Sequence, residues 1–203
     1  MARDITQLHP LLQYKIKKLQ EKCKKKGLKL GISECFRSVE EQNALYAKGR
    51  TVPGKVVTKA RGTSLSSQHQ WGIAFDIFQN IKGKEYDDTF INEVAKIAKK
   101  LGLGWGGDWK SFPDTPHFYL KKWGSTTTAL KREYGSFASF KRTWTARVVG
   151  NAAMRKGKLF TSKKIMKIPK GSKVEILRKS KLPSVAFVKY AGKYGYIRIS
   201  KLK

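Results

Sequence analysis

The stretch that decides the fold runs from Ser67 to Asp76 and reads Ser-Gln-His-Gln-Trp-Gly-Ile-Ala-Phe-Asp. Polar and turn-forming residues come first and alternating apolar residues follow, a pattern that predicts a turn leading into a strand over residues 73–78. Asp76 lies in the middle of that strand, between two apolar neighbours. We expect its carboxylate to be buried, and a buried charge needs a partner or a metal ion.

A second short stretch, from Asp114 to Phe118, reads Asp-Thr-Pro-His-Phe. The chain has three histidines, and two of them, His69 and His117, fall in these two stretches. Together with Asp76 they supply two imidazoles and a carboxylate, a ligand set that holds zinc and leaves a position for water. Asp114 could serve as the base that such a water needs. The alternative is that both histidines are structural, as we expect for the third, His9.

The charge of the chain points to anionic partners. With 44 Lys and Arg against 14 Asp and Glu, the formal net charge is +30, which favours polyanions such as nucleic acid, an anionic membrane surface or an anionic cell wall. No stretch has the roughly 20 apolar residues of a membrane span, and the N-terminus lacks the apolar core of a secretory signal. We therefore expect a cytoplasmic protein in its producing host, with Cys23 and Cys35 as buried thiols.

Hydrophobic periodicity predicts two long helices, over residues 7–26 and 88–101, and a shorter one that starts after Ser38 and stops at Gly49. Strands are predicted over residues 28–33, 73–78 and 118–120, and residues 50–68 read as a loop.

The composition shifts near residue 124. Residues 129–142 read as a weak helix or more linker, and beyond residue 142 Glu175 is the only acidic residue against seventeen Lys and Arg. Short strands separated by turns are predicted there: 145–149, 165–168, 173–177, 186–190 and 194–199. The sequence therefore predicts an α+β chain. We expect residues 1–124 to form a catalytic domain with a small antiparallel sheet flanked by helices, residues 125–142 a linker, and residues 143–203 a small all-β barrel.

Five stretches carry a resemblance to a known family. The two described above resemble the zinc motifs of the D-Ala-D-Ala carboxypeptidase and L-Ala–D-Glu endopeptidase group. Three more are similar to its L-alanyl-D-glutamate peptidase branch, which includes phage endolysins: Leu8-His9-Pro10, the run from Phe36 to Arg50, and the run from Leu103 to Trp109. The resemblance spans roughly residues 7–120.

The resemblance implies roles for individual residues. His69, Asp76 and His117 match the zinc ligands, and Asp114 matches the carboxylate that acts as acid and base. Arg37 matches the arginine that stabilises charge on the substrate carbonyl; a surface ion pair with Glu40 or Glu41 is the structural alternative. Substrate-side positions are Ser67, a motif serine beside the site, and Gln42, a glutamine that is either beside the site or structural.

Residues 143–203 resemble bacterial Src-homology-3-like (SH3-like) domains. The runs from Ile168 to Leu177 and from Val188 to Ile197 carry this resemblance, whereas Ala186-Phe187 departs from the tryptophan often found there. The resemblance implies a cell-wall-binding domain, and its excess of positive charge suits anionic wall polymers. A solvated basic surface and a nucleic-acid-binding surface are the alternatives, although no nucleic-acid motif accompanies it.

The resemblance implies an endolysin that cleaves the L-Ala–D-Glu bond of peptidoglycan stem peptides with Zn2+, and that acts on the wall after release through a membrane pore. Its partners would be peptidoglycan and anionic cell-wall polymers, and nothing in the sequence requires more than a monomer. A D,D- or L,D-carboxypeptidase of the same zinc group and a host autolysin remain alternatives. A non-catalytic basic protein that binds wall or nucleic acid is a more distant one.

Overall fold

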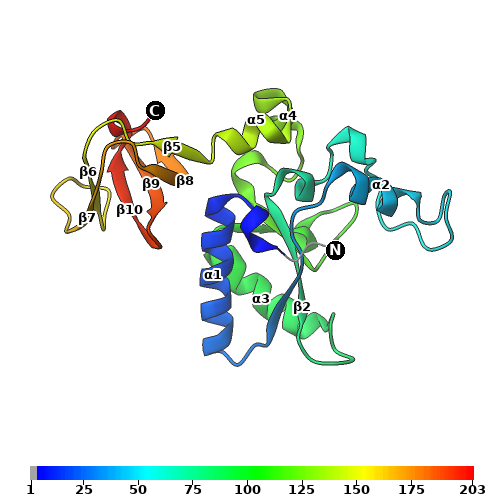
Figure 1. Cartoon of the computed structure of the whole chain (residues 1–203). Helices are drawn as coiled ribbons and strands as arrows, with labels where there is room; N and C mark the ends of the chain where they lie inside the picture. The colour runs from blue at the N-terminus through cyan, green and yellow to red at the C-terminus, as the bar shows by residue number, and fades with distance from the viewer. Residues whose placement is uncertain (1–3) are drawn as a thin grey trace. The chain divides into compact units, whose positions relative to one another are not determined.

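In the computed structural model, which describes residues 4–203, the chain divides into two units, residues 1–137 and 138–203 (Figure 1). Both units combine hydrogen-bonded sheets with helices or turns, so the chain has a mixed helix and sheet architecture. The expectation of a missing secretory signal falls partly on residues 1–3, which lie outside the described residues.

The first unit contains a four-stranded antiparallel sheet with the order β1-β2-β4-β3. Its strands are β1 (Leu30–Glu34), β2 (Ala74–Gln79), β3 (Leu103–Trp105) and β4 (His117–Leu120). In β2, side chains alternate between two faces. The face with Phe75 is fully buried together with Phe118, its partner on β4, whereas the opposite face carries Asp76.

Two helices, α1 (Pro10–Lys25) and α3 (Asp88–Lys100), pack on each other and on the sheet (Figure 1). Their buried residues recur at helical spacing, as the periodicity predicted. The first helix starts at Pro10 and not at residue 7, because the His9 side chain accepts a hydrogen bond from Leu11 N (3.1 Å) and caps it.

The third helix of this unit, α2 (Val39–Ala47), begins with the predicted cap. The Ser38 side chain accepts from Glu41 N, and the Glu41 carboxylate accepts from Ser38 N, which together form a capping box. Two short helices follow the four-stranded sheet, α4 (Thr128–Tyr134) and α5 (Phe137–Arg142), within the segment predicted as a linker or weak helix. The described residues also contain six short 3-10 helices: η1 (Ile5–Gln7), η2 (Gly62–Ser64), η3 (Gln68–Trp71), η4 (Gly106–Asp108), η5 (Lys121–Trp123) and η6 (Ile199–Lys201).

The second unit is a six-stranded antiparallel sheet with the order β5-β8-β9-β10-β6-β7. Its strands are β5 (Thr145–Arg147), β6 (Ala152–Arg155), β7 (Lys164–Ile168), β8 (Lys173–Ser180), β9 (Val185–Tyr190) and β10 (Lys193–Arg198). Among the described residues β5 and β7 end this order and do not pair with each other, so the sheet is not a closed barrel. Strand β6 was not predicted as a strand.

The β9–β10 hairpin turns at Ala191-Gly192, where both residues have a positive φ (46° and 73°). Two consecutive positive φ values suit the two-residue turns that join twisted strands, and glycine adopts them without strain. The sheet encloses a small apolar cluster that includes Met154, Ile168 and Val188.

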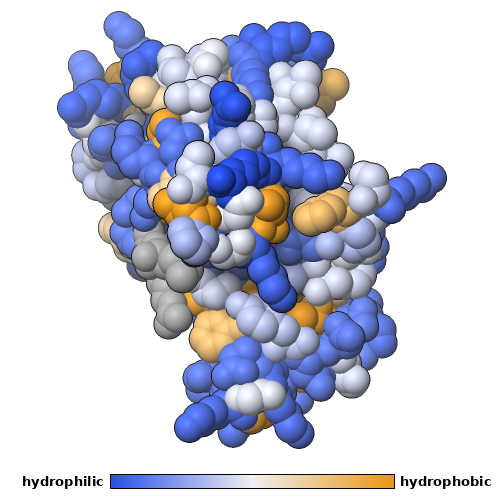
Figure 2. All heavy atoms as spheres, turned by 90° about the vertical axis from the view of Figure 1, so that its right-hand side faces the viewer, coloured by the Kyte–Doolittle hydropathy of each residue, from blue (hydrophilic) through white to orange (hydrophobic). Residues whose placement is uncertain are grey.

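Hydrophilic side chains cover most of the face drawn in Figure 2, with small apolar areas scattered between them. Within residues 4–203, none of the helices combines the length and the apolar character needed to cross a bilayer.

Candidate metal centre and catalytic residues

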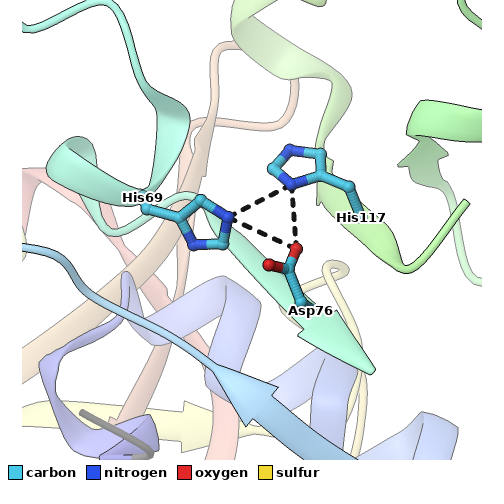
Figure 3. A group of neighbouring side chains, drawn as sticks. All are labelled: His69, Asp76 and His117. Carbon is cyan, nitrogen blue, oxygen red and sulfur yellow. Dashed lines mark hydrogen bonds and ion pairs between the residues drawn. The ribbon is translucent and has the colours of Figure 1, made fainter. Parts of the chain in front are cut away.

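Three elements bring His69, Asp76 and His117 together (Figure 3). His69 lies on the short helix η3, Asp76 in the middle of β2, and His117 at the start of β4. Asp76 and His117 are direct partners across the two strands, so their side chains leave the same face of the sheet. His69 Nε2 lies 3.2 Å from His117 Nδ1 and 3.3 Å from Asp76 Oδ1, and His117 Nδ1 lies 3.0 Å from Asp76 Oδ1.

The His69 ring is oriented by the main chain. Its Nδ1 lies 2.7 Å from the carbonyl oxygen of Cys35, just after β1. Because a carbonyl oxygen can only accept, Nδ1 carries the proton of the neutral ring and Nε2 keeps its lone pair. The lone pair of Nε2 therefore faces the other two side chains.

The His117 ring is oriented by Gln68, which the sequence analysis did not single out. His117 Nε2 lies 2.8 Å from Gln68 Oε1, while Gln68 Nε2 donates to the carbonyl oxygen of Gly124 (3.3 Å). The contact with Gly124 assigns the amide, so Oε1 is the end that accepts from His117. His117 then keeps the lone pair of Nδ1 for the centre. The available signal in the sequence was the position of Gln68, directly before His69 in the predicted turn.

The electrostatics of the three residues favour positive charge at their meeting point. Burial opposes ionisation of Asp76, but the two imidazoles outweigh it and hold the pKa of this carboxyl well below its usual range. Burial also disfavours a charged His69, yet the facing Asp76 carboxylate raises the pKa of His69 above its usual value. Both shifts indicate a site that attracts a cation.

The donor set fits a zinc ion. Two imidazole nitrogens and a carboxylate oxygen turn lone pairs toward one another, and only a cation or a proton relieves their mutual repulsion. Zinc bonds of about 2.0–2.2 Å in a tetrahedron place neighbouring ligand atoms about 3.3 Å apart. The observed separations of 3.0 to 3.3 Å match that spacing. Hydrogen bonds from each histidine to a second group are also typical of zinc ligands.

Asp114 lies in the turn that leads to His117. His117 N donates to Asp114 O (3.2 Å), and Asp114 N donates to Gly106 O (3.1 Å). Burial raises the pKa of the half-buried Asp114 carboxyl, an effect that His117 partly offsets. A methyl group on Gly106 would lie 2.4 Å from Asp114 O, so glycine there allows the turn to pack closely.

Arg37 is buried beside the centre and does not form the surface ion pair considered as an alternative. Its Nε donates to Glu34 Oε1 (2.5 Å), its Nη1 donates to Gln42 Oε1 (2.7 Å), and its backbone N donates to His69 O (3.3 Å). Within residues 4–203, Nη2 has no hydrogen-bonded partner, so this end of the guanidinium remains available.

Gln42 and Ser67 differ in how firmly the structure holds them. Gln42 is fully buried, and its Nε2 donates to the carbonyl oxygen of Ala60 (2.9 Å) and to Thr58 Oγ1 (3.2 Å). It therefore acts as a brace behind Arg37. Ser67 caps η3 without a hydrogen bond from its side chain, and it is half-buried two residues from His69.

An aromatic wall borders His117. The Trp109 ring lies 5.1 Å from the His117 ring and 5.8 Å from the Tyr119 ring, measured between centroids. Tyr119 stands on the same face of β4 as His117, two residues further along. The tryptophan thus packs against a residue of the centre and not only within the core.

The sequence profile of the D-alanyl-D-alanine carboxypeptidase family matches residues 60–120, a range that contains His69, Asp76, Asp114 and His117. Among solved structures, the L-Ala D-Glu endopeptidase ChiX of Serratia marcescens is 20% identical with a TM-score of 0.42, and the match covers 58% of this chain and 83% of that one.

Two curated relatives are more similar in sequence. The peptidoglycan L-alanyl-D-glutamate endopeptidase CwlK of Bacillus subtilis (strain 168) is 42% identical over 124 residues, which cover 56% of this chain and 73% of that protein. An L-alanyl-D-glutamate peptidase of Listeria phage A118 is 34% identical over 119 residues, 55% of this chain and 38% of that protein. Identity at this level across most of the Bacillus protein, together with the profile match, means that the chain belongs to the L-alanyl-D-glutamate peptidases of the D-alanyl-D-alanine carboxypeptidase family.

Proposed function

We propose that the chain is a zinc-dependent peptidoglycan hydrolase that cleaves the L-Ala–D-Glu bond of stem peptides. The observation that carries this proposal is the convergence of three lone pairs, from His69, Asp76 and His117, with a second group orienting each imidazole. The names of the two curated relatives support the choice of bond.

In this proposal His69 Nε2, His117 Nδ1 and Asp76 Oδ1 hold the metal. Zinc bound there would supply a water molecule acidic enough to lose a proton near neutral pH. Asp114 accepts the proton of the attacking water and later returns it to the leaving amine. Its raised pKa brings proton uptake closer to neutral pH than for an ordinary aspartate.

Arg37 would stabilise the negative charge that develops on the scissile carbonyl oxygen. Glu34 and Gln42 hold the Nε and Nη1 of the guanidinium, which leaves Nη2 to donate to the substrate. A donor that is already fixed in place costs no reorganisation when the charge appears. We assign Gln42 to the positioning of Arg37, and Ser67 to the edge of the substrate site.

We further propose that residues 143–203 form an SH3-like domain that retains the enzyme on the wall, with residues 1–124 as the catalytic domain. The short antiparallel strands of the second unit and its excess of Lys and Arg support this division. Attraction to anionic polymers would weaken with salt, because exposed charges are screened beyond about 10 Å at 0.1 M. Action on the wall as a phage-type endolysin is consistent with the Listeria phage relative.

Mass spectrometry of digested muropeptides tests the choice of bond. A new free D-Glu amine supports the proposal, whereas released D-Ala would support a carboxypeptidase, the activity in the description of the matching family. Cleavage should stop with a chelator and return with zinc. A His117→Ala protein that still cleaves at the wild-type rate would exclude the proposed centre, whereas a wild-type chain that cleaves nothing would leave a non-catalytic binding role.

A further inference from the structure

A small hollow of about 200 Å³ lies in the second unit, between β6, the segment that follows it, and β10 with η6. All the residues that line it belong to residues 151–201, so it lies within this unit. Its lining combines four cationic and two aromatic side chains: Arg155, Lys158, Arg198, Lys201, Phe160 and Tyr196.

The positive charge of this hollow is not neutralised within its own unit. Glu175 is the only acidic residue of residues 138–203. Its Oε1 lies 3.0 Å from Lys189 Nζ in an ion pair, and neither residue lines the hollow. Among the described residues, none of the four cations of the hollow forms an ion pair. Four uncompensated cations around one small volume attract an anion more strongly than the same charges spread over a surface.

Two arginines of the hollow are held in place without using up their donors. The guanidinium carbon of Arg198 lies 4.1 Å from the centroid of the Phe160 ring, and Arg198 donates no hydrogen bond to the described residues. Arg155 Nη1 donates to the carbonyl oxygen of Ser162 (2.8 Å), which leaves its other N–H groups. Stacked or braced arginines lose less side-chain entropy on binding, and their fork geometry suits the oxygens of a phosphate.

The hollow also offers an apolar surface. Phe160 is 43% exposed, so part of its ring is open to a ligand in the hollow. Tyr196 lies beside it in the lining, and its ring packs on Phe187 at 4.8 Å between centroids. A ligand that alternates anionic groups with carbon-rich spacers would satisfy both the cations and the exposed ring.

We propose that this hollow binds a phosphodiester group of a polyol-phosphate wall polymer. The inference rests on the proposed wall function, and it replaces diffuse attraction over the basic unit by one defined site. A stem-peptide carboxylate brings one anionic group, whereas successive phosphodiesters joined by polyol or sugar spacers bring several anionic groups to the four cations and carbon-rich surface to the aromatic rings. Nucleic acid shares the phosphodiester, so the experiment must separate the two.

The test measures binding of the full chain to purified walls at 4 °C, before and after acid extraction of the phosphodiester polymers. A pocket variant, Lys158→Gln with Arg198→Gln, is compared with a control variant, Lys167→Gln with Lys179→Gln. Both pairs remove two exposed charges, but the control residues do not line the hollow. We expect the pocket pair to weaken binding to intact walls by about tenfold or more, since each loses charge-assisted hydrogen bonds, and the control pair by less than about threefold.

Two further measurements distinguish the possible ligands of the hollow. Phe160→Ala, a change at an exposed ring, should weaken binding to intact walls without loss of folding, and soluble polyol-phosphate polymer should compete better than single-stranded DNA. Equal weakening by the two double variants, unchanged binding to extracted walls, or stronger competition by DNA would each overturn the proposal. Cleavage of soluble muropeptides, followed in parallel, should stay at the wild-type rate in all variants. If the wild-type protein does not cleave soluble muropeptides at all, the proposed peptidase function is wrong, whatever the binding results.

Discussion

Replacing Gln68 by leucine should weaken zinc binding although Gln68 is not a ligand. The Gln68 side chain accepts from His117 Nε2 at 2.8 Å, and both residues are at least 95% buried. Without this acceptor the ring can move its proton to Nδ1, the atom that must carry the lone pair. Loss of such an orienting partner costs about 10–100-fold in metal affinity, equivalent to about 1.4–2.7 kcal/mol.

The assay is a competition titration of the purified full chain against a chromophoric chelator. Gln70→Leu is the matched control, because Gln70 lies on the same short helix, is similarly buried, and donates its side-chain hydrogen bond to Gly62 O (2.7 Å) and not to a histidine. Gln68→Glu keeps an acceptor and should stay within about threefold of the wild type. Wild-type affinity in Gln68→Leu, or an equal loss in Gln70→Leu, would refute the reasoning.

Four further predictions concern catalysis and stability. Arg37→Ala should lower kcat by about 10²–10³-fold with the zinc content unchanged, measured by muropeptide cleavage and elemental analysis. Gly106→Ala sets a methyl group against Asp114 O and should lower Tm by several degrees along with activity. Because the pKa of Asp114 is raised, kcat/KM should fall on acidification at a higher pH than for an ordinary aspartate. Burial lowers the pKa of His9 to about 3 in the folded protein, so between about pH 6.5 and pH 3 its imidazole is protonated in the unfolded chain but not in the folded one. The free energy of unfolding should therefore fall by about 1.4 kcal/mol for each pH unit of acidification over this range.

Each of these predictions has an outcome that contradicts it. Arg37→Ala at the wild-type rate would remove the guanidinium from the reaction, and an unchanged Tm in Gly106→Ala would mean that the turn has room to move. If the fall of kcat/KM at low pH persists in Asp114→Asn, another group causes it. For His9, denaturant titrations of His9→Asn, which keeps a good cap, should show a flatter pH dependence; an unchanged slope assigns the effect elsewhere.

Local sequence patterns were enough to predict much of the first unit. The alternation around Asp76 indicated β2, the Ser38 and Glu41 pair indicated the start of α2, and the spacing of apolar residues indicated α1 and α3. These features depend on neighbours within a few positions, where periodicity and capping chemistry are informative. The start of α1 differed because the His9 side chain replaced the expected helical turn.

The contacts that orient the site could not be predicted in the same way. The Gln68 side chain donates to Gly124 O, and His69 donates to Cys35 O, and the two residues of each pair are far apart along the chain. Their partners follow from strand register and not from spacing. Glu34, which pairs with Arg37, is a neighbour in sequence. Strand β6 was missed because apolar and polar residues alternate only weakly in Ala152-Ala153-Met154-Arg155. This segment is a strand because it pairs with β7 and β10, which its own residues do not indicate.

The direct pairing of Asp76 with His117 across β2 and β4 has a consequence for handling the enzyme. Backbone hydrogen bonds of the sheet, not the ion, keep these two side chains together, so stripping the metal should leave a folded, inert protein. Such an apoprotein could be stored and then switched on by a stoichiometric dose of zinc, in contrast to small zinc-dependent domains that collapse when the ion is withdrawn. Far-ultraviolet circular dichroism should hardly change between the two forms.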